Sequence, residues 1–408
     1  MHRLEEDPLL FRTRELAREY HAEAIDLRRR LHQYPELSFE EVETSRFVSQ
    51  TLSSYGIEHL SGVGGHGIVA LIQGEGKGPR RCIALRADMD ALPIEEANPV
   101  AYKSKRPGVM HACGHDAHTA SMLVAARILY DLRAHYGGQV KVLFQPGEEK
   151  LPGGASLMIR DGALRKPRPA GIIGQHVHPP LPAGSVGFRA GMYMASSDEI
   201  YLTVRGKGGH GAMPHACIDP VAISACILTA LQQLVSRHAD PTTPSVLTFG
   251  KINSVGGATN IIPSEVRIEG TFRTMDEHWR AEALRRIAAI ARDTAKGMGG
   301  ACEARIVRGY PMLRNHEALT ARVRAAAVRF LGPDRVFDLP IRMTSEDFAY
   351  YTHEIPGCFY RLGVGNPDRG IVSQVHTPTF DIDEEALYVG AGLPAWTALE
   401  LLGADSAF

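Results

Sequence analysis

Three histidines, a cysteine and an aspartate stand within eight residues, in the stretch His111-Ala112-Cys113-Gly114-His115-Asp116-Ala117-His118. Neutral imidazole and thiolate are a ligand set for zinc and similar borderline metals. The stretch precedes an apolar-periodic segment, residues 119–132, so we expect a loop that enters a helix. The alternative is a histidine-rich surface loop in which Asp116 caps the helix, because short Cys/His tracts are only compositional signals.

Two adjacent carboxylates follow a predicted strand in Gln145-Pro146-Gly147-Glu148-Glu149. One member of such a pair can bind a metal while its neighbour acts as general base on a metal-activated water. Asp88 and Asp90 end another predicted strand, and His176 and His178 follow a third. Ligands of parallel α/β sheets bind at the carboxyl ends of the strands, so these side chains are expected to converge with the Cys/His stretch. A solvated acidic turn, or a histidine satisfied at a strand end, is the alternative.

Four further polar residues are weaker candidates. His376 precedes Thr377 and Pro378 and lies far along the chain from the other candidate ligands. His210 stands among glycines that suit close approach to a ligand, although it could be a loop histidine without a partner. Asn260 could be a turn residue. Arg273 could be a surface charge, or it could hold a substrate carboxylate by a bidentate contact.

The intervening segments alternate between strand and helix. This order predicts an α/β fold in which a mixed, largely parallel sheet is flanked by helices. The predicted strands are residues 68–72, 82–85, 139–144, 171–175 and 358–364, and the predicted helices are residues 15–34, 41–55, 119–132, 155–161, 317–331 and 384–402.

The pattern changes near Gly191. From there the order is strand, helix, two strands, helix and strand, which is the split ferredoxin-like arrangement. We therefore predict an α+β domain at residues 190–308 inserted into a catalytic domain formed by residues 1–189 and 309–408.

Composition narrows the class of protein. The 408 residues carry a formal net charge of -1 and 22% charged side chains, so nothing favours nucleic acid or an anionic membrane as partner. The six cysteines show no disulfide-framework spacing, which fits a reducing compartment. Neither a signal peptide nor a membrane span is recognisable in the sequence. We expect a cytoplasmic protein whose partners are small molecules.

Over nearly its whole length, the chain resembles the cocatalytic metallopeptidases of the aminoacylase and carboxypeptidase type. It looks closest to their amidohydrolase branch, which contains hippurate hydrolase, N-acyl-amino-acid amidohydrolases and plant auxin-conjugate hydrolases. The matching stretches are residues 86–93, 111–118, 144–149, 206–215, 260–263, 345–348 and 376–378.

The resemblance implies a binuclear site that holds two divalent ions, Zn²⁺ or Mn²⁺, with Glu148 as general base. A thiolate suits zinc, whereas this branch is often associated with manganese. The implied ligands are Cys113, His115, Glu149, His176 and His376.

The resemblance also implies a homodimer formed through the inserted domain. His210 would bind substrate there and polarise the scissile carbonyl, often across the dimer. Asn260 and Arg273 match positions tied to the carboxylate of the substrate. Asp88 or Asp90 would orient a ligand histidine by contacting its ring without binding the metal itself.

The expected function is hydrolysis of the amide bond of N-acyl amino acids, either hippurate-like or N-acetylated. A dipeptidase or carboxypeptidase with the same metals is the alternative within enzymes. A non-catalytic binder of small molecules or a metal-sequestering protein is the alternative outside them. The presence of both Glu148 and Glu149 argues against that last class, because metal storage needs no base next to a ligand.

Overall fold

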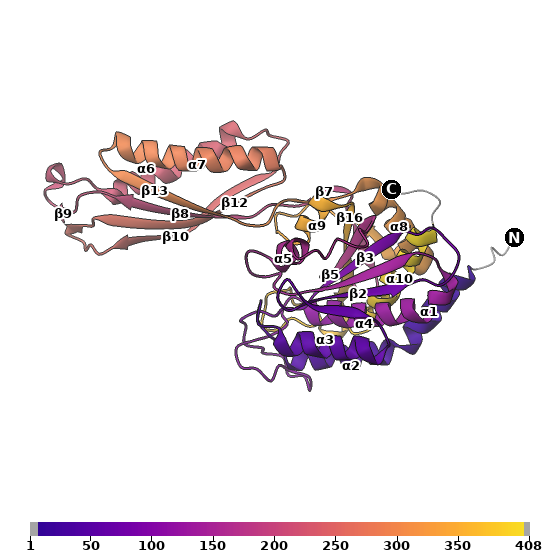
Figure 1. Ribbon diagram of the computed structural model, residues 1–408. Helices are drawn as coiled ribbons and strands as arrows, with labels where there is room; N and C mark the ends of the chain where they lie inside the picture. The colour runs from indigo at the N-terminus through magenta and orange to yellow at the C-terminus, as the bar shows by residue number, and fades with distance from the viewer. Residues whose placement is uncertain (1–6, 404–408) are drawn as a thin grey trace. The chain divides into compact units, whose positions relative to one another are not determined.

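The computed structural model describes residues 7–403, which form two compact units (Figure 1). The first unit contains the chain up to Gly191, Arg314–Pro340 and the chain from Asp347 onward. The second contains Met192–Leu313 and the short segment Ile341–Glu346. Within residues 7–403, no helix is both long and apolar enough to cross a membrane.

A mixed sheet forms the centre of the first unit and has eight strands among the described residues. Its middle strands are parallel, because β3 pairs in parallel with β4 and β5, and β5 pairs in parallel with β16. The outer pairs β1/β2 and β2/β4 are antiparallel. In spatial order the strands are β1 (His59–Val63), β2 (Gly67–Gln73), β4 (Gln139–Gln145), β3 (Cys82–Asp88), β5 (Gly171–Pro182), β16 (Gly357–Gly365), β6 (Val186–Phe188) and β15 (Val336–Asp338).

Two helices of the first unit are buried on nearly every side, and they pack against each other. They are α4 (His115–Asp131) and α10 (Ala386–Gly403), whose alanines and glycines permit close packing. Outer helices cover them, with α2 against α4 and both α1 and α8 against α10. The remaining bounds are α1 (Pro8–Glu19), α2 (His21–Gln33), α3 (Val42–Ser54), α5 (Gly154–Arg160), α8 (Glu317–Leu331) and α9 (Ala349–Glu354).

The second unit has the ferredoxin-like order that the sequence pattern predicts. Its described strands form a four-stranded antiparallel sheet in the order β10, β12, β8, β13. Helices α6 and α7 pack against each other and against this sheet, with a separate apolar core. The bounds are β8 (Asp198–Arg205), α6 (Pro220–Gln233), β10 (Ser245–Val255), β12 (Glu265–Thr274), α7 (Glu277–Gly297) and β13 (Ala301–Arg308).

The single helix predicted at residues 15–34 is wrong: the structure has two helices there, α1 and α2, which meet at Tyr20, where ψ is 6°. Two further boundaries differ from the sequence-based expectation, and both lie at polar residues. Helix α4 begins at His115 rather than at residue 119, so Asp116 lies inside the helix and does not cap it. Strand β5 continues to Pro182, which places His176 and His178 on the strand. Hydrophobic periodicity misses both extensions because the added residues are polar yet buried or half-buried.

Candidate active site

Parallel pairing brings the predicted strand-end residues to one edge of the sheet. Asp88, the last residue of β3, lies opposite Gln145, the last residue of β4. The turn that follows β4 carries Glu148, which is 6% exposed, and Glu149. Strand β5, next to β3, supplies His176 from its longer carboxyl end. The site therefore lies where parallel α/β sheets bind ligands.

Helix α4 begins against this edge because of one glycine. Gly114 is the residue before the helix and has φ 81°, a conformation that L side chains rarely adopt. A Cβ there would lie 2.5 Å from Cγ2 of Val177 on β5. The close approach places Cys113 beside the strand, with its Sγ 3.4 Å from Nε2 of His176. His115 lies in the first turn of the helix.

All five residues implied as metal ligands come together in the structure. Two groups, each with ligand atoms within 4.8 Å of one another, are Cys113 with His115 and His176, and Cys113 with Glu149 and His376. Nε2 of His376 lies 3.1 Å from Oε1 of Glu149, and Nε2 of His115 lies 4.0 Å from the same oxygen. Cys113 belongs to both groups, and this set of thiol, imidazole and carboxylate donors would suit divalent cations.

Hydrogen bonding shows which atoms are available for a metal. Nδ1 of His115 lies 2.9 Å from the backbone oxygen of Asp90 and 3.2 Å from its carboxylate, whereas the buried Nε2 of His115 has no hydrogen bond among the described residues. Oε1 of Glu149 is also buried without a hydrogen bond there. Nδ1 of His176 contacts the carbonyl of Val177 at 2.8 Å, which directs Nε2 toward Cys113. A buried imidazole nitrogen without a hydrogen bond in the described part of the chain, close to a thiol and to a carboxylate oxygen that lies 3.1 Å from Nε2 of His376, fits a bound cation.

The electrostatics of the cluster lead to the same conclusion. Burial raises the pKa of the Cys113 thiol well above its usual value, and the nearby Glu149 and Glu148 raise it further. Burial opposes protonation of His115, but the carboxylates of Asp88 and Asp90 prevail and raise its pKa to about 10. Several carboxylates buried together need positive charge to offset their desolvation. Divalent cations would supply that charge and convert the thiol to a thiolate ligand.

The two aspartates of the 86–93 stretch have different roles. Asp90 contacts the ligand candidate His115 through Nδ1 and accepts a hydrogen bond from the Glu149 N–H at 2.9 Å. Asp88 lies 2.6 Å from Nδ1 of His118, whose Nε2 accepts the Val177 N–H at 2.9 Å. Both nitrogens of His118 are therefore engaged, and this histidine fixes strand β5 rather than a metal.

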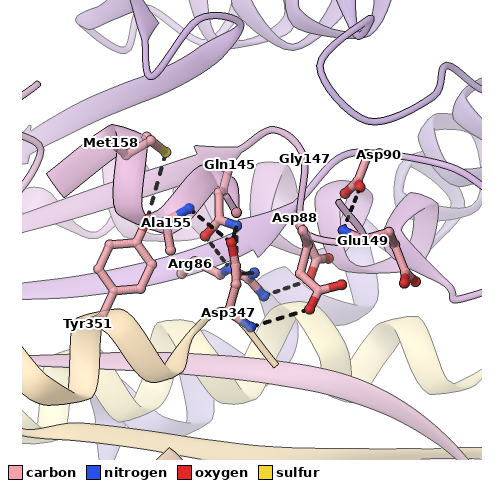
Figure 2. A network of polar contacts seen from close by, with 12 residues as sticks. Arg86, Asp88, Asp90, Gln145, Gly147, Glu149, Ala155, Met158, Asp347 and Tyr351 are labelled. Atoms are coloured by element: carbon pink, nitrogen blue, oxygen red, sulfur yellow. Dashed lines mark hydrogen bonds and ion pairs between the residues drawn. The ribbon is translucent and has the colours of Figure 1, made fainter. Parts of the chain in front are cut away.

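A buried polar network at the ends of β3 and β4 was not predicted from the sequence (Figure 2). Its members are Arg86, Gln145 and Asp347, all fully buried. Arg86 joins the carboxylates of Asp88 and Asp347. The sequence signals that could have pointed to it are the matching stretches 86–93 and 345–348, which contain Arg86 and Asp347. That both side chains are buried becomes visible only in the folded chain.

The residues predicted to bind substrate lie in the second unit at two places. His210 is paired with Ile261 in a short two-stranded ladder, and the Gly211 N–H donates to the Asn260 carbonyl at 2.7 Å. Arg273 lies near the end of β12, where Nη1 donates to the Met343 carbonyl at 3.2 Å. The Asn260 turn precedes the start of β12, so the two places are separated by most of a strand, roughly 25 Å. Within one subunit, the structure does not bring His210 and Arg273 together.

The sequence profile of peptidase family M20/M25/M40 matches residues 84–398. An N-acyl-L-amino acid amidohydrolase of Geobacillus stearothermophilus is 42% identical over 323 residues, which are 78% of this chain and 86% of that protein. Thermostable carboxypeptidase 2 of Saccharolobus solfataricus is 36% identical over 379 residues, which are 92% of this chain and 94% of that protein.

A solved structure shares the fold. The YXEP protein of Bacillus subtilis, described as a dinuclear metal-binding peptidase of the M20 family, superposes with a TM-score of 0.79 at 34% identity. The match covers 94% of this chain and 99% of that one. These findings confirm the expected fold class and the resemblance, and they show that the chain is a hydrolase of linear amide bonds. The protein is a member of peptidase family M20/M25/M40.

Proposed function

We propose that this enzyme hydrolyses the amide bond of N-acyl amino acids, with hippurate-like or N-acetylated substrates. The relative from Geobacillus stearothermophilus, named for that activity, supports the proposal at 42% identity. The observation that supports the mechanism is that two neighbouring carboxylates, Glu148 and Glu149, have different partners. Glu149 faces His376 and His115, whereas Oε1 of Glu148 accepts the Asp347 N–H at 3.3 Å.

In this mechanism, Glu148 is the general base. It takes a proton from the attacking water and then returns a proton to the leaving amine, which departs as the free amino acid. Glu148 lies next to the candidate ligand cluster, with a carboxylate oxygen within 4.8 Å of the ligand atoms of His115 and Glu149. Burial keeps bulk water from competing for the proton.

Two divalent ions, Zn²⁺ or Mn²⁺, are the proposed cofactors. Cys113, His115, Glu149, His176 and His376 would hold them. When bound, such ions supply Lewis acidity toward the carbonyl oxygen and make water more acidic. Asp90 would keep Nε2 of His115 free for an ion by engaging Nδ1.

The test is Glu148→Gln. This change keeps the size of the side chain and removes its basicity, so it should retain wild-type metal content and lose about 10²- to 10⁴-fold in turnover. Elemental analysis measures the metal, and amine release from hippurate and from acetylated amino acids measures turnover. Wild-type turnover by Glu148→Gln would exclude the mechanism.

A carboxypeptidase or dipeptidase activity is the second candidate. It is supported by the 36% identical relative from Saccharolobus solfataricus, which is named a carboxypeptidase. The same amine-release assay decides between the two when dipeptides and blocked peptides are included. Faster release from free dipeptides than from any N-acyl amino acid would replace the first proposal with the second.

We also propose that the enzyme is a homodimer formed through the second unit. Strand β10 is the edge of its sheet and exposes Ile252 and Val255, which are 50% and 47% exposed. Helix α6 exposes Val221 at 47%. An open strand edge beside exposed apolar side chains favours pairing with another chain. A partner subunit would then supply His210 to the site, as the resemblance implies. Sedimentation equilibrium of Ile252→Lys should show monomer where the wild type is dimeric.

A cytoplasmic location is proposed with these assignments. All six cysteines lie in the described part of the chain, and none of them is in a disulfide. Cys113 must stay reduced to bind a metal, and a reducing compartment would keep it so.

A further inference from the structure

We infer that Asp347 is a positioning residue for the general base and that the buried Arg86 holds it in place. The inference deepens the proposed function and rests on it, because the group positioned is Glu148. The Asp347 N–H donates to Oε1 of Glu148 at 3.3 Å. This contact engages one carboxylate oxygen of Glu148 from the backbone and so directs how the carboxylate is turned.

The side chain of Asp347 is anchored on several sides (Figure 2). Nη2 of Arg86 donates to Oδ1 at 2.8 Å, and Nε2 of Gln145 lies 2.8 Å from both carboxylate oxygens. The N–H of Ala155, in the first turn of α5, donates to Oδ2 at 2.9 Å. Charge-assisted bonds to a fully buried carboxylate are strong and directional. The backbone of Asp347 therefore cannot shift without breaking them.

Arg86 ties this anchor to the opposite side of the site. Its Nη1 donates to Oδ2 of Asp88 at 2.5 Å, and its Nε donates to Oε1 of Gln145 at 2.9 Å. Asp88 in turn holds His118, which fixes the strand that carries His176. One guanidinium thus sets both the segment behind Glu148 and the strand behind a candidate metal ligand.

The location of Asp347 in the chain explains why such an anchor is needed. Asp347 is the residue at which the chain re-enters the first unit after the Ile341–Glu346 segment of the second. Its N–H belongs to the peptide that joins Glu346 to Asp347. If Arg86 did not hold the side chain of Asp347, the direction of the Asp347 N–H would depend on the conformation of the residues that precede it.

The test uses Asp347→Asn, which keeps the shape of the side chain but not its charge. An amide offers one acceptor where the carboxylate offers two, so its NH₂ must face a donor from Arg86, Gln145 or Ala155. We expect kcat to fall about 10- to 100-fold, because small displacements of a catalytic group have effects of that size. KM and metal content should stay at wild-type values, since no proposed ligand is touched.

The discriminating measurement is the same change in the Glu148→Gln background. A residue that acts only through Glu148 should cause less than about a twofold further loss there, because its effect disappears with the base. A residue that merely supports the fold should cause its full loss in both backgrounds. A multiplicative loss, or a rise in KM together with loss of metal, would overturn the inference.

A matched control is available in the second unit. The carboxylate of Asp198 accepts Nε and Nη2 of Arg280 at 2.8 and 2.6 Å and is also buried. Asp198→Asn removes a buried arginine partner of the same chemistry without touching the site, so kcat should stay unchanged. If Asp347→Asn does not fold, Gln145→Met keeps both charges of the Arg86 pair and loosens the same anchor. Gln145→Met alone should then give the same loss of kcat, and in the Glu148→Gln background it should cause almost no further loss.

Failure of this inference is distinguishable from failure of the proposed function. Wild-type turnover by Glu148→Gln itself would remove the general base and the proposed mechanism with it. If Glu148→Gln is inactive but Asp347→Asn keeps the wild-type kcat, the proposed mechanism stands and only the positioning role of Asp347 is refuted.

Discussion

The replacement of Asp90 by asparagine should weaken metal binding although Asp90 is not itself a proposed ligand. The Asp90 carboxylate is buried, and it is shared by Nδ1 of His115 at 3.2 Å, the Glu149 N–H at 2.9 Å and Oγ of Ser38 at 2.6 Å. Two of these partners belong to candidate ligands. Asp90 therefore controls the imidazole of one and the backbone of the other.

The size of the effect follows from what an amide can still accept. Asparagine can keep an oxygen toward Ser38 and Glu149 only by turning its NH₂ toward His115. The Nδ1–H then keeps only the backbone oxygen of Asp90 as acceptor, at 2.9 Å, and the facing NH₂ repels it, so the imidazole is held less firmly with Nε2 toward an ion. Loss of such an orienting carboxylate typically costs 10- to 100-fold in metal affinity. That range corresponds to about 1.4 to 2.8 kcal/mol.

The assay is competition for zinc or manganese against a chromophoric chelator at fixed pH and salt. Ser38→Ala is the control, because it removes one hydrogen bond from Asp90 but leaves the carboxylate facing His115. Its affinity should fall by less than tenfold, or under about 1.4 kcal/mol. If Asp90→Asn bound both ions with wild-type affinity, the argument that the Asp90 carboxylate orients His115 would be refuted.

Three further outcomes are expected. Cys113→Ser should bind fewer than two ions per subunit by elemental analysis, because Cys113 belongs to both ligand groups, and full retention of two ions would contradict this. Lys141→Met should lower the free energy of unfolding in urea by about 3 kcal/mol with unchanged kcat, since Nζ of the buried Lys141 donates to three backbone carbonyls between residues 163 and 167. Burial, together with the nearby Asp90 carboxylate, raises the pKa of Glu41 from 4.5 to about 7. The folded state therefore binds this proton more tightly than the unfolded state does, and metal-free protein should lose stability as the pH rises from the lower of these values through the higher. Glu41→Gln should remove up to about 3 kcal/mol of this loss between pH 5 and 8, and denaturation curves of equal pH dependence for both proteins would refute it.

Much of the fold could be predicted because its elements obey local rules. Helix α8 has the bounds that the sequence predicts, and β16 extends one residue beyond the predicted strand at each end. Each has apolar periodicity with few buried polar residues. The prediction failed where buried polar residues replaced the apolar pattern, as at His115–His118 and at the end of β5.

The candidate site could be predicted in part. Residue type identified Cys113, His115 and the Glu148/Glu149 pair as candidates, strand order predicted that they meet at one edge, and the resemblance implied Glu149 as the ligand of the pair. Their proximity, the atoms they present and the roles of their neighbours needed the folded chain. The sequence alone could not separate Asp88 from Asp90, because the two aspartates stand in the same short motif.

The sequence by itself determined the chemistry available to this protein, the alternation of its elements and, by resemblance, its family. These depend on residue type, on spacing and on local hydrogen bonding within single helices and turns. Tertiary structure alone decided that Arg86 from β3 meets Asp347 from the far end of the chain and that Asp347 contacts Glu148. The physical reason is burial, since a carboxylate and a guanidinium that look like surface charges in sequence become specific partners only after packing removes them from water.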